Sequence, residues 1–233
     1  MKKLKNKIKR LAIIPARLGS TRIKKKNIKL FNGKPMISYP IRELKESKIF
    51  KKIFVSTEDN LVKKISQKYG ASVDFLRPKN LSKDIVPLSL VLKNVLSEFN
   101  KRSEIYDEIW LVYPCNPLLN KFDIIKAKKK FEKTSKVYPM ISIKEFEAPI
   151  EWAFEKKNNI YKSINKKKLY TDSKKIKKKY FESASFIIYT RKQLLSDQKY
   201  HDYYGYLMKS HKAIDIDTKN DWDHALKLFN IKD

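Results

Sequence analysis

Short apolar runs recur along the chain and alternate with segments whose apolar residues follow a helical spacing. The runs have the composition of buried strands, and they cover residues 11–16, 53–57, 73–76, 109–113, 140–143, 185–189 and 213–217. The clearest helical stripe is formed by Leu88, Val91, Leu92, Val95, Leu96 and Phe99. Shorter stripes cover residues 61–69 and 225–229, the second after expected cap residues at 218–221. This alternation predicts an α/β fold, a three-layer sandwich with a mostly parallel central sheet.

One long segment interrupts the alternation. Residues 145–180 include the run EKKNNIYKSINKKKLYTDSKKIKKKY, which has little apolar periodicity. We expect a single domain over residues 1–233 from which this Lys-rich excursion departs. Two interpretations stay open for it: an insertion that protrudes toward a partner subunit, or a mobile, solvated basic loop.

The charge balance is extreme but does not identify a partner by itself. The chain has 54 Lys and Arg against 25 Asp and Glu, a formal charge of +29. Lys, Ile, Asn and Tyr are enriched together, as an AT-rich coding bias would produce, so we expect neither a nucleic-acid nor a membrane partner. The apolar run at residues 11–16 is shorter than the ~7–15 residues of a signal-peptide core, which predicts a cytoplasmic protein.

The scarcity of cysteine and glycine excludes several common kinds of site. Cys115 is the only cysteine, so a disulfide within the chain and a multi-cysteine zinc site are excluded. The four glycines lie too far apart for a G-x-G-x-x-G or a G-x-x-x-x-G-K-[ST] motif. A nucleotide site in this chain must therefore be built in another way.

The polar segment RLGSTRIKKKN at residues 17–27 directly follows the first predicted strand. Ligands of open α/β sheets bind beyond the carboxyl ends of the strands. Gly19 permits close backbone approach, and its neighbours offer hydroxyl donors and cations suited to a polyphosphate: Ser20, Thr21, Arg17, Arg22 and Lys26. A solvated basic surface is the alternative interpretation.

A second polar cluster lies in AIDIDTKNDW near the C-terminus. On a strand, Asp215 and Asp217 would point to the same face and could converge on a hard cation such as Mg²⁺. The alternative is that Asp217 caps the following helix and Asp215 is a surface residue. A cation-rich loop and a carboxylate pair at one sheet describe a nucleoside triphosphate held with Mg²⁺, which implies phosphoryl or nucleotidyl transfer.

The segment IIPARLGSTRIKKKNIKLFNGKPMISYPI resembles the N-terminal motif of the acylneuraminate cytidylyltransferase family, which makes CMP-activated nonulosonic acids. VSTED, YGASVDFLRPKNLSKD, YPCNPLL and DIDTKNDWDHA follow in the same order, so the resemblance covers about residues 11–229. EAPIEWAF at 147–154 and FLRP at 75–78 are most similar to pseudaminic acid cytidylyltransferases. The resemblance implies the nucleotide-diphosphosugar transferase fold, which is Rossmann-like, and a homodimer.

The same resemblance implies an activity and a site. The activity is Mg²⁺-dependent transfer of CMP from CTP to the anomeric hydroxyl of a nine-carbon nonulosonic acid of pseudaminic or sialic type, with release of pyrophosphate. The expected catalytic residues are Arg17, Lys26, Asp215 and Asp217, of which the two aspartates would hold the metal. The expected nucleotide contacts are Ala16, Arg17, Gly19, Ser20, Arg22, Lys26, Asn27, Arg77, Ser82 and Pro114.

The chain departs from the family pattern at several positions. Thr21 stands where the family usually has Lys, and FESASFIIY at 181–189 stands where pseudaminic-type enzymes usually have DAGQFY. Glu182 and Ser185 thus replace an Asp and a Gln. Two other functions remain as alternatives: a DxD-type glycosyltransferase that uses a nucleotide sugar at Asp215 and Asp217, and a basic nucleic-acid-binding protein.

Overall fold

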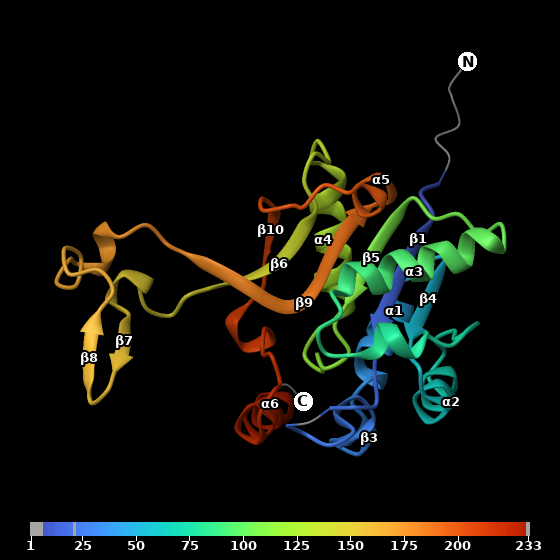
Figure 1. Cartoon of the computed structure of the whole chain (residues 1–233), viewed down its shortest axis with the longest axis horizontal. Helices are drawn as coiled ribbons and strands as arrows, with labels where there is room; N and C mark the ends of the chain where they lie inside the picture. The colour runs from blue at the N-terminus through green and yellow to red at the C-terminus, as the bar shows by residue number, and fades with distance from the viewer. Residues whose placement is uncertain (1–6, 21, 232–233) are drawn as a thin grey trace.

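A six-stranded sheet forms the centre of the molecule in the computed structural model, which describes residues 7–20 and 22–231 (Figure 1). The strand order is β10-β6-β9-β5-β1-β4. The strands are β1 (Arg10–Pro15), β4 (Lys52–Ser56), β5 (Glu108–Val112), β6 (Met140–Glu145), β9 (Tyr180–Thr190) and β10 (Tyr204–Leu207). β9 is antiparallel to both of its neighbours, and the other pairings are parallel. The predicted mostly parallel sheet is therefore confirmed.

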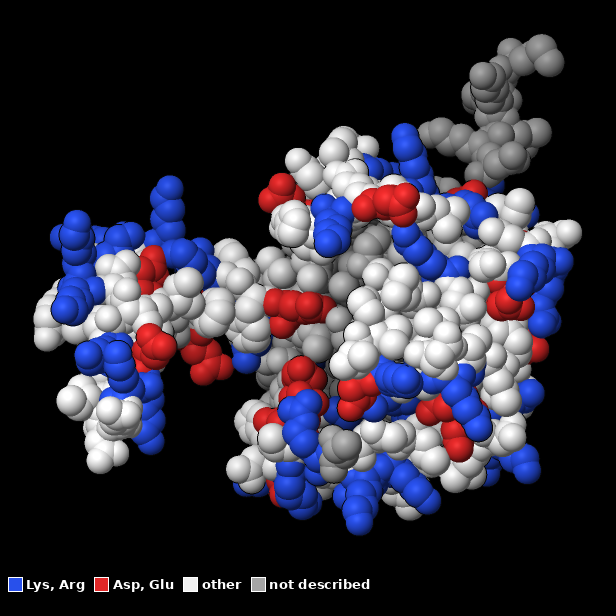
Figure 2. All heavy atoms as spheres, viewed as in Figure 1, with Lys and Arg blue, Asp and Glu red and all other residues white. Residues whose placement is uncertain are grey.

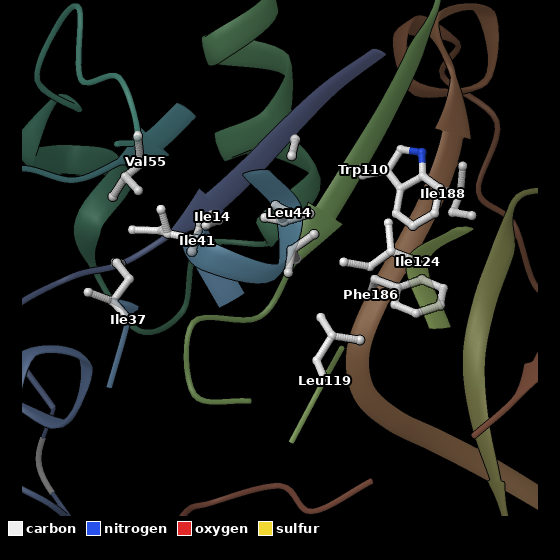
Figure 3. Close-up of a cluster of buried hydrophobic side chains, with 14 of the residues drawn as sticks. Ile14, Ile37, Ile41, Leu44, Val55, Trp110, Leu119, Ile124, Phe186 and Ile188 are labelled. Carbon is white, nitrogen blue, oxygen red and sulfur yellow. The ribbon is translucent and has the colours of Figure 1, made fainter. Parts of the chain in front are cut away.

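Helices cover both faces of this sheet. The first face carries α1 (Ser38–Ser47), α2 (Asn60–Lys68) and α4 (Lys121–Glu132), and the other carries α3 (Leu88–Lys101) and α5 (Arg191–Leu195). Alternation along β1 explains the layering, because Ala12 and Ile14 pack toward α1 while Leu11 and Ile13 pack toward α3. Figure 3 shows the first cluster, in which Trp110 and Phe186 of neighbouring strands lie close together. The three-layer α/β prediction is confirmed.

A third apolar cluster extends the fold beyond the carboxyl end of β1. It joins the small hairpin of β2 (Leu30–Phe31) and β3 (Lys34–Pro35) to the C-terminal helix α6 (Lys219–Ile231). The rings of Phe31 and Trp222 meet edge to face at 5.3 Å. This packing fixes the segment just before α6 against the segment just after β1.

Side-chain caps set several helix starts. Asp59 Oδ1 accepts hydrogen bonds from the N–H groups of Leu61 and Val62 at 2.8 and 2.9 Å, which begins α2. At α6, Thr218 and Asp221 bond reciprocally, since the Thr218 hydroxyl accepts from the Asp221 N–H and the Asp221 carboxylate accepts from the Thr218 N–H. The capping role that was an alternative for Asp217 therefore belongs to Thr218 and Asp221.

Two of the predicted strands are wrong. Residues 73–76 are irregular chain between two contacts with the edge of β4, an isolated parallel bridge at Ser72 and a bond from Arg77 N to Thr57 O. Residues 213–217 are also irregular, because Ala213 packs into the sheet cluster while Ile216 packs under α6. Val73, Ala213 and Ile216 are buried by packing into these clusters rather than by strand pairing, whereas Leu76 is 39% exposed. Strand β10, which the sequence did not predict, lies beside β6 instead.

The Lys-rich excursion forms an arm that stands away from the sheet (Figure 1). It contains the antiparallel hairpin of β7 (Phe154–Lys157) and β8 (Ile160–Ser163), which the sequence did not predict. Single turns of 3₁₀-helix complete the fold at η1 (Lys26–Ile28), η2 (Lys79–Ser82), η3 (Ile150–Trp152), η4 (Ser173–Lys175) and η5 (Ser210–Lys212). Figure 2 shows Lys and Arg on the arm and on several other parts of the visible face, with acidic residues among them.

Within residues 7–20 and 22–231, none of the helices has both the length and the apolar content needed to cross a bilayer.

Candidate active site

A cleft of about 460 Å³, called the main cleft below, opens beyond the carboxyl ends of β1 and β5. It brings together most of the residues that the sequence singled out. These are Arg17, Ser20, Arg22, Lys26, Asn27, Arg77, Pro114, Asp215 and Asp217. Their convergence follows from the parallel strands, whose carboxyl ends meet at one edge of the sheet.

Three of the expected residues that the structure describes are not brought into the main cleft. Ala16 is fully buried in the apolar core beneath it. Gly19 is exposed, and the nearest atom to its missing side chain belongs to Arg17 at 3.8 Å. Ser82 lines an adjoining hollow of about 390 Å³ that shares Arg17 and Arg77 with the main cleft. Thr21 lies outside the described residues.

The loop after β1 is held by buried and partly buried hydrogen bonds. The Asn27 side chain donates to the Arg17 carbonyl at 2.8 Å and accepts from the Cys115 thiol at 3.2 Å. The Leu18 N–H donates to Glu58 Oε1 at 3.0 Å. Lys25 adopts the left-handed conformation with φ of 54° and begins the single turn η1. These contacts bend the segment so that its charged side chains turn toward the cleft.

The cations of this loop are paired with carboxylates of the C-terminal segment. Lys26 Nζ lies 2.9 Å from Asp217 Oδ1 and donates to the Ile216 carbonyl at 2.5 Å. Arg22 lies 2.8 Å from the other oxygen of Asp217. Arg17 pairs with Asp84 of the adjoining hollow. The main cleft thus places cations suited to a polyphosphate directly against an acidic pair.

The Asp215 carboxyl has a different environment from its neighbour. Burial raises the pKa of Asp215, the nearby Asp217 raises it further, and Lys26 and Arg22 oppose the shift. Two carboxylates held this close repel each other unless a cation or a proton lies between them. Oxygen donors of this kind suit a hard divalent cation.

The described residues contain no group of three or more His, Cys, Asp or Glu arranged around a common metal position. A cation at Asp215 and Asp217 would therefore take its other oxygen ligands from a bound substrate and from water. Mg²⁺ is commonly bound in this way, through one or two carboxylates and substrate phosphates. The donor set of this chain fits such an ion.

Arg77 is held at the other side of the main cleft. Its guanidinium donates to Glu58 Oε2 at 2.8 Å, and its side chain is almost fully buried. Burial acts to raise the pKa of Glu58, but the hydrogen bonds from Arg77 and from the Leu18 N–H outweigh it and lower the pKa. Glu58, which was not among the site residues expected from the sequence, therefore ties Arg77 to the loop after β1.

A second cavity of about 460 Å³ adjoins the main cleft, and Leu88 and Tyr113 line both. Its other lining residues include Lys93, Tyr189, Gln193, Lys199 and Tyr203. The Tyr113 hydroxyl donates to Glu182 Oε1 at 2.6 Å. Burial, and then this hydrogen bond, raise the pKa of Tyr113. No sequence pattern singled out Tyr113 beyond its place at the end of a predicted strand.

Cys115 lies on the floor of the main cleft, where burial raises the pKa of its thiol to about 12. Thiolate chemistry at neutral pH needs a lowered pKa and an exposed sulfur. Cys115 has neither, so its thiol serves as a hydrogen-bond donor to Asn27 rather than as a nucleophile.

Comparison with known proteins gives consistent matches. A family model described as cytidylyltransferase matches residues 11–232. The pseudaminic acid cytidylyltransferase of Campylobacter jejuni is 33% identical, with 96% of this chain and 97% of that protein covered. The CMP-N,N'-diacetyllegionaminic acid synthase of Legionella pneumophila is 28% identical over 95% of this chain and 96% of its own length.

Among solved structures, a CMP:2-keto-3-deoxy-manno-octonic acid synthetase complexed with CTP superposes with a TM-score of 0.72. It is 14% identical in sequence, and the match covers 96% of this chain and 99% of that one. At this identity the likeness concerns the fold alone.

Proposed function

Because the chain belongs to the cytidylyltransferase family, we propose that it transfers CMP from CTP to the anomeric hydroxyl of a nine-carbon nonulosonic acid and releases pyrophosphate. The observation that carries this proposal is the main cleft, where Arg17, Arg22 and Lys26 lie opposite Asp215 and Asp217. We propose a pseudaminic-type acceptor, since the C. jejuni relative is named for pseudaminic acid. CTP is a cytoplasmic metabolite, and we propose the same location for the reaction.

In this reaction the anomeric hydroxyl attacks the α-phosphorus of CTP in line with the leaving pyrophosphate. The new bond joins the anomeric oxygen to phosphorus, the bond to the pyrophosphate oxygen breaks, and the hydroxyl proton passes to solvent. Charge grows on the phosphate oxygens, so positioned cations contribute most of the catalysis. Arg17, Arg22 and Lys26 supply these charges once CTP has displaced their carboxylate partners.

We propose that Asp215 and Asp217 hold Mg²⁺, which neutralises developing negative charge on the triphosphate when it is bound. The raised pKa of Asp215 supports this assignment, because a neighbouring cation would relieve the repulsion between the two carboxylates. Lys26 bonds to the Ile216 carbonyl as well as to Asp217, and it therefore keeps its place when Asp217 changes partner.

For the cytidine we propose the side of the main cleft that leads to Arg77 and Ser82, since the main cleft meets the adjoining hollow of about 390 Å³ there. For the acceptor we propose the second cavity. It adjoins the main cleft at Tyr113, which is where the anomeric hydroxyl must reach the α-phosphorus. Lys199 and Lys93 offer this cavity positive charge for a sugar acid, Lys93 once its pair with Asp197 at 3.5 Å is exchanged for the ligand.

We further propose that the protein is a homodimer that uses the arm. Several apolar side chains of the arm are exposed, including Phe154, Ile160, Tyr161 and Tyr170 at 52%, 63%, 63% and 93%. Burial of such side chains against a second copy is favourable at about 25 cal/mol per Å². Light scattering of Ile160→Glu tests this: we expect a monomer, whereas Ile105→Glu on the body should leave the mass unchanged.

The activity is tested by measuring pyrophosphate release with each of the four NTPs, Mg²⁺ and a panel of nonulosonic acids. We expect activity with CTP and with a pseudaminic-type acceptor. Activity with UTP but not with CTP would contradict the proposal. A DxD-type glycosyltransferase would instead consume a nucleotide sugar and release no pyrophosphate, so the same assay separates the two reactions.

A further inference from the structure

Resting on the proposed transfer of CMP, we infer that Glu182 recognises the acceptor sugar at the boundary between the main cleft and the second cavity, by accepting a hydrogen bond from one of its hydroxyl or acylamino groups. Tyr113 acts as the positioning residue for Glu182. The inference rests on the placement of Glu182, on the strained backbone that presents it, and on its lack of a cationic partner.

The position of Glu182 follows from Tyr113. This tyrosine lines both cavities, and its hydroxyl donates to Glu182 Oε1 at 2.6 Å. Two residues further along β9, Ala184 lines the main cleft. Ser183 and Ser185 are both buried on the opposite side. The Ser183 and Ser185 hydroxyls lie 3.3 Å apart, so these two side chains share one face, and the exposed Glu182 lies with Ala184 on the other, open side.

The backbone of β9 is distorted at this point. Glu182 pairs with Ile143 of β6 and Ile187 pairs with Ile141, so β9 bulges between these two positions. Ala184 sits in the bulge with φ of 47°, a left-handed conformation that is unfavourable for any residue with a side chain. Such strain persists only where surrounding contacts impose it, and it is concentrated at functional sites.

The contacts that impose it come from Ser142 of β6. Its buried hydroxyl accepts hydrogen bonds from the N–H groups of Ser185 and Phe186 at 3.2 and 3.0 Å. These bonds replace the strand ladder that the bulge interrupts. The bulge is therefore a fixed feature, and it re-aims the preceding residues toward the cavities, as bulges beside active sites commonly do.

The electrostatics of Glu182 are unusual for this chain. Lys and Arg outnumber Asp and Glu by 54 to 25, yet no Lys, Arg or His of the described residues forms an ion pair with Glu182. Its charge instead acts on two tyrosines of the second cavity. Burial and then the charge of Glu182 raise the pKa of Tyr203. Burial, then Tyr203 and then Glu182 raise the pKa of Tyr189. One oxygen accepts from Tyr113, and because the Glu182 side chain is exposed, the other oxygen is open to solvent and to a ligand.

The chemistry of the ligand group follows from this charge. A carboxylate repels the triphosphate and the carboxylate of a sugar acid, and it binds hydroxyl and amide N–H donors well. The acceptor offers both kinds of donor around its ring and side chain. Glu182 thus distinguishes acceptors by the donors that they present, while the cations of the main cleft hold the anionic groups.

The test uses the full-length enzyme with steady-state kinetics for both substrates. We expect Glu182→Gln to raise the KM for the acceptor about tenfold or more, because a charged acceptor of hydrogen bonds is lost, and to leave the KM for CTP within about twofold. Tyr113→Phe should raise the acceptor KM less, and Glu182→Asp should retain more acceptor binding than Glu182→Gln. Glu98→Gln on α3 is the matched control with the same change of charge.

A panel of acceptors that each lack one hydroxyl or acylamino group identifies the donor. We expect one analogue to bind equally to the wild type and to Glu182→Gln, because that analogue has already lost the contact. An equal penalty across every analogue would overturn the inference, and so would an acceptor KM unchanged in Glu182→Gln.

Acceptor binding to the CMP-saturated enzyme is also titrated calorimetrically. A wild type that releases no pyrophosphate with any acceptor refutes the proposed function. Equal acceptor binding by the wild type and Glu182→Gln refutes the assignment of Glu182, so the two failures are distinguished.

Discussion

Replacement of Asp217 by Asn tests the acidic pair most directly. The substitution keeps the size of the side chain and removes its charge. Asp217 forms ion pairs with Arg22 and Lys26, whose side chains are 65% and 18% exposed. A pair with a side chain as exposed as Arg22 contributes almost nothing, and Lys26 keeps its bond to the Ile216 carbonyl at 2.5 Å. We therefore expect Asp217→Asn to lower the free energy of unfolding by only about 1 kcal/mol.

For a chain of this length, about 1 kcal/mol corresponds to a fall in Tm of about 2–4 °C. The catalytic effect should be far larger, because an anionic metal ligand is lost where charge develops. We expect kcat to fall by about 100-fold or more, equivalent to about 2.7 kcal/mol of transition-state stabilisation. In the presence of CTP, the affinity for Mn²⁺ should fall as well.

Pyrophosphate release measures the fall in kcat, and thermal unfolding measures the fall in Tm. Mn²⁺ titration by electron paramagnetic resonance measures the loss of metal affinity. Asp223→Asn is the matched control, since Asp223 forms an exposed pair with Lys219 on the adjacent helix α6. Unchanged turnover and Mn²⁺ affinity in Asp217→Asn would refute the metal role. A fall in Tm of more than about 10 °C would instead show that Asp217 has a structural role that the ion-pair argument missed.

Three further predictions concern groups around the site. Because its pKa is raised to about 12, Cys115 remains a protonated thiol at pH 8. Mass spectrometry should find its alkylation by iodoacetamide at least about 100-fold slower than that of a free cysteine, with a rate that rises with pH. Rapid labelling would contradict its burial. Ser142→Ala leaves two buried N–H groups of the β9 bulge without their acceptor, so urea unfolding should show a loss of about 2–4 kcal/mol, with a near-neutral result counting against a fixed bulge. Lys212→Met leaves Asp123 as a buried carboxylate without its cation and should lower the free energy of unfolding by about 3–5 kcal/mol. The double variant Lys212→Met/Asp123→Leu should largely recover this loss in the same urea measurement. Equal losses in the single and double variants would contradict the reasoning.

Much of the fold is readable from local patterns. The runs at 11–16, 53–57, 109–113, 140–143 and 185–189 are strands, because residues buried on both sides leave a continuous apolar signal. The stripe from Leu88 to Phe99 is α3, with every residue of the stripe after Leu88 buried. The same reasoning fails at 73–76 and 213–217, where Val73, Ala213 and Ile216 are buried without a pairing strand.

The main cleft was predictable to a similar extent. Residues close in sequence to the end of β1, such as Arg17 and Lys26, were identified because the position of a loop after a parallel strand is informative. The expectation failed for Ala16, which belongs to the same motif but is buried in the core beneath the cleft. Asp215 and Asp217 line the cleft as expected, although the segment between them is irregular chain rather than a strand.

Local periodicity and motifs of contiguous residues are enough to specify the layered α/β fold, the family, and the loop and acidic pair that form the main cleft. The contacts made across the sheet depend instead on how the strands are ordered in space. Arg77 meets Glu58, Cys115 meets Asn27, and Tyr113 meets Glu182, each across 19 or more positions of sequence. Partners of this kind have no fixed spacing along the chain, since strand order and the bulge of β9 bring them together.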